Sequence, residues 1–434
     1  MLALLGFSMI AVFMFFLMTG RLSALIALII VPILFAVIGG FAGDLGPMIM
    51  DGIQSVAPTG VMLLFAILYF GIMIDSGLFD PLIKRILKAV KGDPLKVALG
   101  TALLISLVAL DGDGTTSYMI TISAMLPLYK RLKMNPLVLT CIAMLGFGVM
   151  NISPWGGPTA RAIAALQLDA TEMFTPLIPV MAGGILWVFV TAFILGRKER
   201  QRLGVIDLDS AKETAGFSET AAAVEADEWK RPKLLWFNLG LTLLLLFCLI
   251  KGILPLPILF MIAFAIAIMV NYPNQEHQKD RIRTHAGNVL AVVALVFASG
   301  VFTGILSGTK MVDAMANSMI AVIPEAFGPY FAVITAVASM PFTYFMANDP
   351  YYYGVLPIIA KTAAAYGVDP IQIARASVLG MPVHAMSPLM ASAYLLCGMS
   401  GVEFGAHQKF ILKWAILTSL AMIATALLTG AISF

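Results

Sequence analysis

Long apolar runs follow one another along almost the whole chain. A helix needs roughly 20 predominantly apolar residues to span the hydrocarbon core of a bilayer. Only 12% of the residues are charged, whereas a soluble domain carries roughly 25%. The sequence therefore predicts an all-α polytopic membrane protein surrounded by the lipid bilayer, with no sign of nucleic-acid binding. We place ten spans near residues 2–19, 22–42, 57–76, 136–165, 174–196, 234–251, 254–271, 286–307, 370–398 and 410–431.

Two further apolar stretches, residues 95–128 and 329–361, are too long for a single span and carry polar residues at their middles. Lysine and arginine are enriched on the cytoplasmic side of membranes. Basic residues precede the first stretch at 84–96 and follow it at 130–133, so both of its ends are predicted to be cytoplasmic. Each stretch is therefore predicted to form a re-entrant hairpin, two short helices that enter and leave on one side. Basic-poor loops, among them 43–56, and both termini are then predicted to lie outside.

The chain repeats a pattern across a polar segment at 198–232, which we interpret as a cytoplasmic linker. An Asn-Pro or Asp-Pro pair at positions 135 and 369, and a Ser-Pro pair at 153 and 387, recur at one separation of 234. Residues 1–197 and 233–434 are therefore predicted to be two repeats, each with five spans, one hairpin and one broken helix. Because five is odd, the second copy is inverted in the membrane, an arrangement typical of secondary transporters.

Four polar segments are predicted to interrupt helices at membrane depth: the hairpin tips 111–116 and 347–350 and the mid-span breaks 151–159 and 384–388. Half-helix N-termini direct partial positive charge at a bound anion, and glycines let the backbone approach it closely. Serine, threonine and asparagine supply neutral hydrogen-bond donors. The candidate substrate-binding residues are Thr115, Thr116, Asn151, Ser153, Gly156, Gly157, Thr159, Asn348 and Ser387.

Five ionisable residues lie in or next to these segments, and an ionisable residue at membrane depth is a functional candidate by default. Asp113 and Asp349, with Asp111 as a third, are candidate metal contacts, because carboxylates suit an anion site if the anion arrives with a metal or if a proton neutralises them. Arg161 is a candidate for charge balance. His384, alone of the four histidines, is predicted to lie at depth and is a candidate for proton coupling. The alternatives are solvated tips, an ion-paired or snorkelling arginine, and a hydrogen-bonded core histidine.

Several of these motifs resemble a known superfamily. Residues 110–128, which end in Met-Leu-Pro-Leu, are similar to the first hairpin of the ion transporter superfamily, and Asn348-Asp349 is similar to its second hairpin tip. Residues 1–31 and the motif Asn-Ile-Ser-Pro-Trp-Gly-Gly-Pro-Thr-Ala-Arg at 151–161 resemble the bacterial citrate–divalent metal–proton symporters (CitMHS). That similarity runs over essentially the full chain.

The resemblance implies an importer of citrate complexed with a divalent metal such as magnesium or calcium, coupled to protons, in the bacterial inner cell membrane. It also implies a homodimer with an elevator-type transport domain. The superfamily's tips carry Ser-Asn-Thr, whereas both tips here carry aspartate. This departure favours metal or proton handling over sodium coupling.

Three alternatives remain open at this point. Another carrier of the superfamily would be a sodium-coupled di- or tricarboxylate symporter, or a sodium/proton or arsenite antiporter. An intramembrane enzyme is disfavoured, because the chain has no His-Glu-x-x-His or Gly-x-Ser-x-Gly motif. A channel is disfavoured because hairpins that open to opposite faces suit gated access better.

Overall fold

The computed structural model of the chain describes residues 1–90, 92–204 and 228–433, and these residues form helices, turns and loops without any strand. The first half contains α1 (Leu2–Met18), α2 (Ala24–Ile38), η1 (Ala42–Asp44), α3 (Leu45–Asp75), α4 (Asp80–Val90), α5 (Pro94–Val108), η2 (Ala109–Asp111), α6 (Gly114–Arg131), α7 (Pro136–Met150), α8 (Gly157–Leu166), α9 (Ala170–Phe174) and α10 (Leu177–Leu203). The second half contains η4 (Pro232–Leu234), α12 (Leu235–Lys251), α13 (Leu256–Asn271), α14 (Gln275–Gly308), α15 (Met311–Ile320), η5 (Glu325–Tyr330), α16 (Phe331–Phe345), η6 (Pro350–Val355), α17 (Leu356–Ala365), α18 (Pro370–Val378), α19 (Met381–His384), α20 (Ala391–Ser400) and α21 (Phe404–Leu428).

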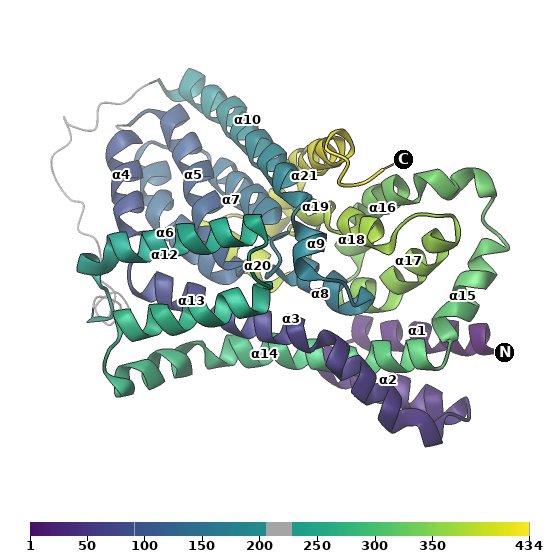
Figure 1. Cartoon of the computed structure of the whole chain (residues 1–434). Coiled ribbons are helices and arrows are strands. Elements are labelled where there is room, and N and C mark those ends of the chain that lie inside the picture. Colours follow the sequence, from purple (N-terminus) through teal and green to yellow (C-terminus); the bar gives the residue numbers. More distant parts are fainter. Residues whose placement is uncertain (91, 205–227, 434) are drawn as a thin grey trace.

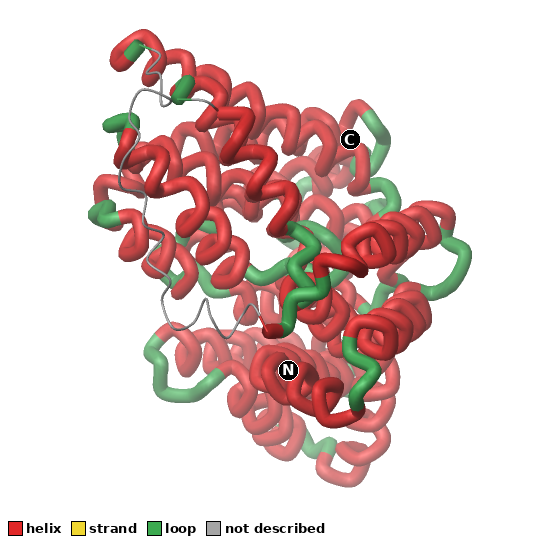
Figure 2. The backbone as a smooth tube through the Cα atoms, turned by 90° about the vertical axis from the view of Figure 1, so that its left-hand side faces the viewer, coloured by secondary structure: helices red, strands yellow, loops and turns green. Residues whose placement is uncertain are grey.

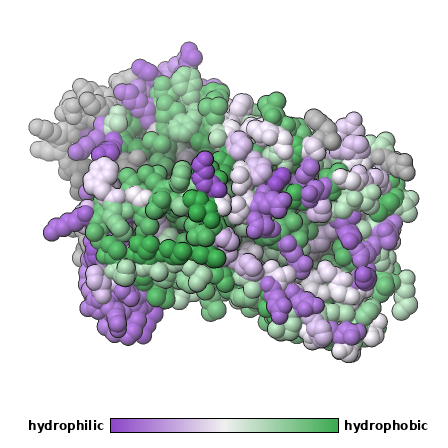
Figure 3. Space-filling view, viewed as in Figure 1, coloured by the Kyte–Doolittle hydropathy of each residue, from purple (hydrophilic) through white to green (hydrophobic). Residues whose placement is uncertain are grey.

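The helices have the length and apolarity that a membrane requires. Within the described ranges, seven helical segments are long and apolar enough to span a bilayer, and five shorter apolar helices accompany them. Large apolar side chains remain exposed on their outer faces, among them Ile38, Trp236 and Leu243. Figure 3 shows hydrophobic residues gathered left of the centre of one face, with hydrophilic residues at the left-hand edges and scattered over the right-hand half. The prediction of an all-helical, multi-pass membrane protein is confirmed.

A lower layer in Figure 1 consists of α1, α2, α3, α13 and α14, which pack on one another. Its longest pair, α3 and α14, crosses very closely. A Cβ atom added to Gly304 would lie 2.3 Å from the Met48 carbonyl oxygen, and one added to Gly52 would lie 2.0 Å from the Gly300 carbonyl oxygen. Small residues permit this approach of two backbones, which is a common way of packing helices in membranes.

Two predicted spans in this layer, 57–76 and 286–307, prove too short. The helix α3 begins at Leu45 and α14 begins at Gln275, so most of the predicted loop 43–56 is helical, and that prediction is wrong. Apolar length marks only the part of a helix suited to lipid, whereas close packing against a neighbour stabilises the helix beyond it. The packing of Gly52 against α14 lies in this added part of α3.

The upper layer contains α5, α6, α7, α10 and α16 to α21, and Figure 2 shows it from the side. Three of its helices start with the same signal, in which an Asp or Asn side chain accepts a hydrogen bond from the backbone N–H two residues later and proline occupies the first helical position. These caps are Asp93 for α5, Asn135 for α7 and Asp369 for α18. Both features favour a helix start at that residue.

Helices in the upper layer are interrupted where the sequence predicts breaks. The chain leaves helix between α7 and α8, at residues 151–156, and again between α19 and α20, at 385–390. Packed helices α5 and α6 are joined through η2, and α16 is followed by a short non-helical segment and the π-helical η6. Of the predicted linker 198–232, residues 198–203 belong to α10 and 205–227 lie outside the described residues.

Candidate functional site

The tip between α5 and α6 is closed by its own aspartates. Asp111 Oδ1 accepts hydrogen bonds from the Asp113 backbone N–H at 3.0 Å and from the Ser117 hydroxyl at 2.9 Å. Asp113 caps α6, because its Oδ2 accepts from the Thr116 backbone N–H at 2.7 Å. Gly112 between them has φ +77°, which glycine adopts without strain. Both carboxylates therefore order the turn, while Thr115 stands exposed at its surface.

The break between α7 and α8 lies directly against this tip. Trp155 donates its indole N–H to the Leu110 carbonyl at 2.7 Å. A Cβ atom added to Gly156 would lie 2.0 Å from the Asn151 carbonyl oxygen, so this tight turn accepts only glycine. Within the break, the Thr159 hydroxyl donates to the Ile152 carbonyl at 2.8 Å. Thr159 thus holds the loop together.

The second break is attached to the end of α16 in a similar way. His384 Nδ1 lies 2.5 Å from the Thr343 carbonyl oxygen, and the Ser387 hydroxyl donates to the Tyr344 carbonyl at 2.7 Å. From α21, Gln408 donates to the Met386 carbonyl at 3.1 Å. The hydroxyl proton of Ser387, like that of Thr159, is therefore already used within the protein.

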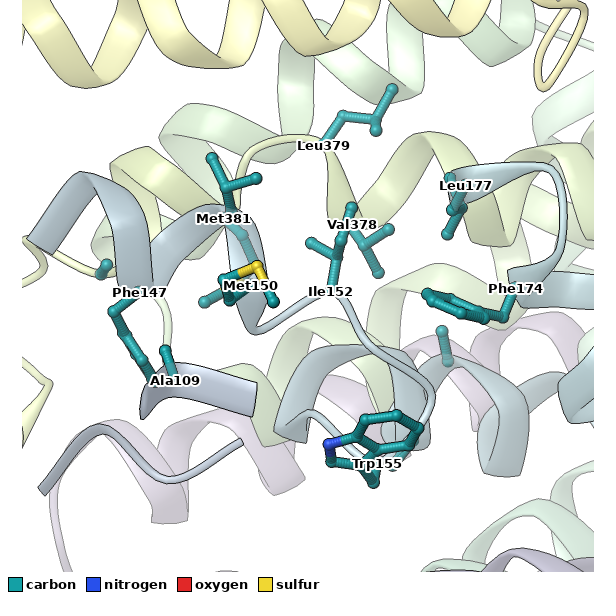
Figure 4. Packing of buried hydrophobic residues seen from close by; sticks show 14 of the residues in the cluster. Ala109, Phe147, Met150, Ile152, Trp155, Phe174, Leu177, Val378, Leu379 and Met381 are labelled. Atoms are coloured by element: carbon teal, nitrogen blue, oxygen red, sulfur yellow. The ribbon is translucent and has the colours of Figure 1, made fainter. Parts of the chain in front are cut away.

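The two halves of the chain meet at these segments. Arg161 on α8 forms an ion pair with Asp349 at the tip before η6, with Nε and Oδ1 2.6 Å apart. A Cβ atom added to Gly114 would lie 3.1 Å from Ser392 Oγ on α20. Each tip therefore contacts the helix that follows the break of the other half. Figure 4 shows the apolar packing around this meeting point, where Met150, Ile152, Val378 and Met381 are close together.

Three of the predicted site residues have a buried side-chain oxygen without a hydrogen-bond partner among the described residues. Asn151 Oδ1, Ser153 Oγ and Asn348 Oδ1 are buried atoms that have no hydrogen bond among the described residues, and the same is true of His384 Nε2. Buried polar atoms are nearly always hydrogen-bonded in proteins, so a cluster of unpaired ones requires an explanation. Binding of a polar ligand supplies one.

The predicted metal contacts do not form a closed metal cage. Among the residues the structure describes, no group of three or more His, Cys, Asp and Glu side chains is placed to hold an ion. Asp111 and Asp113 interact with each other at the first tip, whereas Asp349 is paired with Arg161 at the second. A metal at this site would have to bring most of its oxygen ligands with it.

Three functional neighbours were not predicted. Trp155 and Gln408 hold the breaks through hydrogen bonds to backbone carbonyls. His407 is fully buried, with Nδ1 3.0 Å from Thr140 Oγ1, so His384 is not the only deeply buried histidine. The predicted span 410–431 began too late to include it, because α21 starts at Phe404. Only Trp155 carried a signal in the sequence, since it lies inside the predicted break.

Comparisons of the sequence with known proteins show which family the chain resembles. The family model for the citrate transporters (CitMHS) matches residues 13–380. The chain is 64% identical over 434 residues to a "Citrate transporter" of Bacillus subtilis (strain 168), covering 100% of both chains. It is 58% identical to the "Mg(2+)/citrate complex secondary transporter" of the same organism, covering 100% of this chain and 99% of the relative.

A solved structure has a similar fold. The YdaH transporter of Alcanivorax borkumensis, described as having an unusual topology, superposes with a TM-score of 0.53. The alignment covers 90% of this chain and 88% of that one, at 16% sequence identity. This likeness concerns the fold alone.

Proposed function

This chain belongs to the citrate transporter family, and from that premise we propose that it imports citrate complexed with a divalent metal ion, coupled to protons. The observation that carries the proposal is the meeting of a cation, a carboxylate and unpaired oxygens at the junction of both halves. Arg161 and Asp349 form that ion pair, and Asn151, Ser153 and Asn348 have the unpaired oxygens. A site that combines a cation, a carboxylate and unpaired oxygens suits an anion that is bound to a metal cation.

The metal enters as cargo. Magnesium binds few protein ligands and keeps several waters, and both magnesium and calcium prefer oxygen. The carboxylates of citrate would supply oxygens that the protein lacks, and Asp349 and Asp113 would add to them. A relative of this chain carries Mg(2+)/citrate in its name, which supports magnesium as one usable ion.

The proposal gives the other predicted site residues the following roles. Thr115 and Thr116 at the first tip, with Asn151, Ser153 and Asn348, would hold the citrate carboxylates. Gly156 lets the first break turn tightly against the Asn151 carbonyl, and Gly157 would bring the backbone close to the ligand. Thr159 in this break and Ser387 in the second break fix the loops. Arg161 would balance the charge of the complex, and His384 would take part in proton coupling, with Asp111 supporting the tip.

An inverted-repeat architecture accounts for where the halves meet. Pro382 lies 234 positions after Gly148, the separation at which the sequence repeats. A Cβ atom added to Gly148 would lie 2.8 Å from the Pro382 Cα atom. Residues that correspond in two copies touch each other only near the axis that relates the copies. This contact supports a pseudo-two-fold axis between α7 and α19.

In this proposal, alternating access results from movement of the upper layer relative to the lower layer. In the proposed mechanism the helix pair α5–α6 and the segment α16–α17 are re-entrant hairpins, and the upper layer moves as an elevator against the lower layer. The two layers meet through α8, η6 and η2, which belong to the breaks and tips, and through α15, which packs on α1 and α17. A homodimer in the bacterial inner membrane would anchor the lower layer while the upper layer moves.

Uptake of labelled citrate into proteoliposomes tests the proposal. Uptake should require a divalent ion, should increase with an inward proton gradient, and should be insensitive to sodium. Asp113→Asn and Asp349→Asn should abolish metal-dependent uptake, whereas Asp313→Asn should not. Asp313 is a suitable control because it pairs with Lys361 at 2.8 Å, away from the breaks. Citrate uptake driven by sodium alone, or full activity of both site variants, would contradict the assignment.

A further inference from the structure

The ion pair between Arg161 and Asp349 joins the two halves of the chain at the site. Nε and Oδ1 lie 2.6 Å apart, and the side chains are only 20% and 16% exposed. Arg161 also donates from Nη1 to the Gly157 carbonyl at 3.0 Å, which fixes the guanidinium to the start of α8. Asp349 lies at the other end of the pair, in the segment between α16 and η6. The pair therefore fastens the second tip to the helix after the first break.

A ligand that takes over one member of the pair deprives the other member of its partner. Free citrate could offer a carboxylate to Arg161, but it would leave the Asp349 carboxylate unpaired and facing a second anion. Removing one partner from a buried pair is strongly unfavourable, because the other charge is left uncompensated. A free metal ion has the opposite deficiency, since it could neutralise Asp349 but would leave Arg161 facing a cation.

We infer that the Arg161–Asp349 pair is a latch that only a metal–carboxylate complex opens. A carboxylate of the complex takes the place of Asp349 on the guanidinium, and the metal takes the place of Arg161 on the Asp349 carboxylate. The exchange conserves charge pairing at both ends. It rests on the proposed transport of metal–citrate, and it explains how the site would reject citrate and metal when either arrives alone.

The surroundings of Asp349 fit an exchange of this kind. The neighbouring Asn348 has a buried side-chain oxygen with no partner in the described part of the chain, so a metal held by Asp349 would find a second oxygen beside it. The helix that follows, η6, is a π-helix over Pro350–Val355, a form that is common at functional sites. Opening the latch would release the second tip from α8, so metal–citrate would control the mobility of that tip.

Citrate binding by the purified full-length protein, with magnesium or with a chelator, tests the latch. The wild type should bind citrate at least about tenfold more tightly with magnesium. In Asp349→Asn, no carboxylate competes for Arg161, so the affinity for citrate in chelator should rise and the preference for magnesium should fall to within about threefold. Asp313→Asn, which removes one partner of the Lys361 ion pair, should retain the wild-type preference.

The outcomes separate the latch from the transport function. An Asp349→Asn protein that binds citrate with an undiminished magnesium preference overturns the latch and leaves the proposed function intact. A wild type that binds citrate neither with nor without magnesium overturns the proposed function itself.

A second measurement tests the latch without changing the ion pair, and it can be used if Asp349→Asn does not fold. In a chain whose native cysteines are replaced, the rate at which Ala347→Cys reacts with a maleimide should change when magnesium and citrate are added together. It should not change with magnesium alone or citrate alone. An equal response to citrate alone would overturn the latch.

Discussion

Two serines in equivalent Ser-Pro motifs have opposite surroundings. Ser153 Oγ is buried and has no hydrogen-bond partner among the described residues, whereas the Ser387 hydroxyl donates to the Tyr344 carbonyl at 2.7 Å. Both serines are predicted from the sequence to bind substrate. A sequence motif shows which residue is present, but it does not show where the hydroxyl points. The structure shows one hydroxyl without a partner and one that is bonded to the backbone.

Alanine substitutions should distinguish these two roles. Ser153→Ala removes an unpaired buried hydroxyl, so the melting temperature should be unchanged or higher. Its KM for citrate should nevertheless rise about tenfold, because a hydrogen bond to a charged group is worth about 1.5–3 kcal/mol. Ser387→Ala should instead destabilise the protein by about 1 kcal/mol. Thermal unfolding and citrate uptake measure both effects, and a lower melting temperature for Ser153→Ala with unchanged KM would contradict the distinction.

The indole of Trp155 offers a second comparison at the level of a single hydrogen bond. Trp155→Phe keeps the apolar contact with Phe70 and Phe260, whose ring centroids lie 5.3 and 5.0 Å away. It loses the bond to the Leu110 carbonyl, and an unsatisfied buried group costs about 1–3 kcal/mol. We expect lower stability and faster hydrogen exchange at residues 109–116.

Trp414 provides a matched control for that substitution. It is also buried, but its indole N–H has no hydrogen-bond partner in the described ranges. Trp414→Phe should therefore leave hydrogen exchange at 109–116 unchanged. Equal exchange at the tip in both variants would show that the bond from Trp155 does not hold it.

At the level of elements, helix starts and helix breaks could be predicted from local chemistry. Asp93 and Asn135, each followed by proline, mark the starts of α5 and α7, and the polar glycine-rich segment at 151–159 marks the first break. The true length of α3 could not be predicted, because its added part packs through Gly52 against glycines far away in the sequence. The added start of α14 likewise depends on a distant contact, that of His285 with Asp75. The ion pair between Arg161 and Asp349 could not be predicted either, because its two residues are far apart in the sequence.

The crossing of α7 and α19 should be sensitive to a single methyl group. In Gly148→Ala the new Cβ would lie 2.8 Å from the Pro382 Cα atom, which belongs to backbone and cannot rotate away. Overpacking of this kind costs about 1–3 kcal/mol, and transport should fall because the halves meet here. Gly240→Ala on α12 is the control, since nothing lies within 4 Å of its Cβ position. It should be neutral or stabilising, because alanine favours helix over glycine by about 1 kcal/mol.

On the scale of the whole molecule, the contacts are unevenly distributed between the layers. The lower layer is joined internally by close crossings such as that of α3 and α14, whereas the described contacts between layers pass through the short elements α8, η6, η2 and α15. Composition and apolar length predicted the helical membrane class. The division into two layers could not be predicted in this way, because it depends on which apolar faces pack together.

A cross-link between the layers tests whether they move past each other. Gln167 at the end of α8 donates a hydrogen bond to Ser55 Oγ on α3 at 2.8 Å. In an active background without native cysteines, joining Ser55→Cys to Gln167→Cys should stop citrate uptake, and reduction should restore it. The control pair is Gln372→Cys with Ser433→Cys, which lies within the upper layer and whose native side chains are 2.7 Å apart. The control cross-link should leave citrate uptake unchanged. If uptake continues when the Ser55–Gln167 cross-link is shown to have formed, displacement of α8 against the lower layer is excluded.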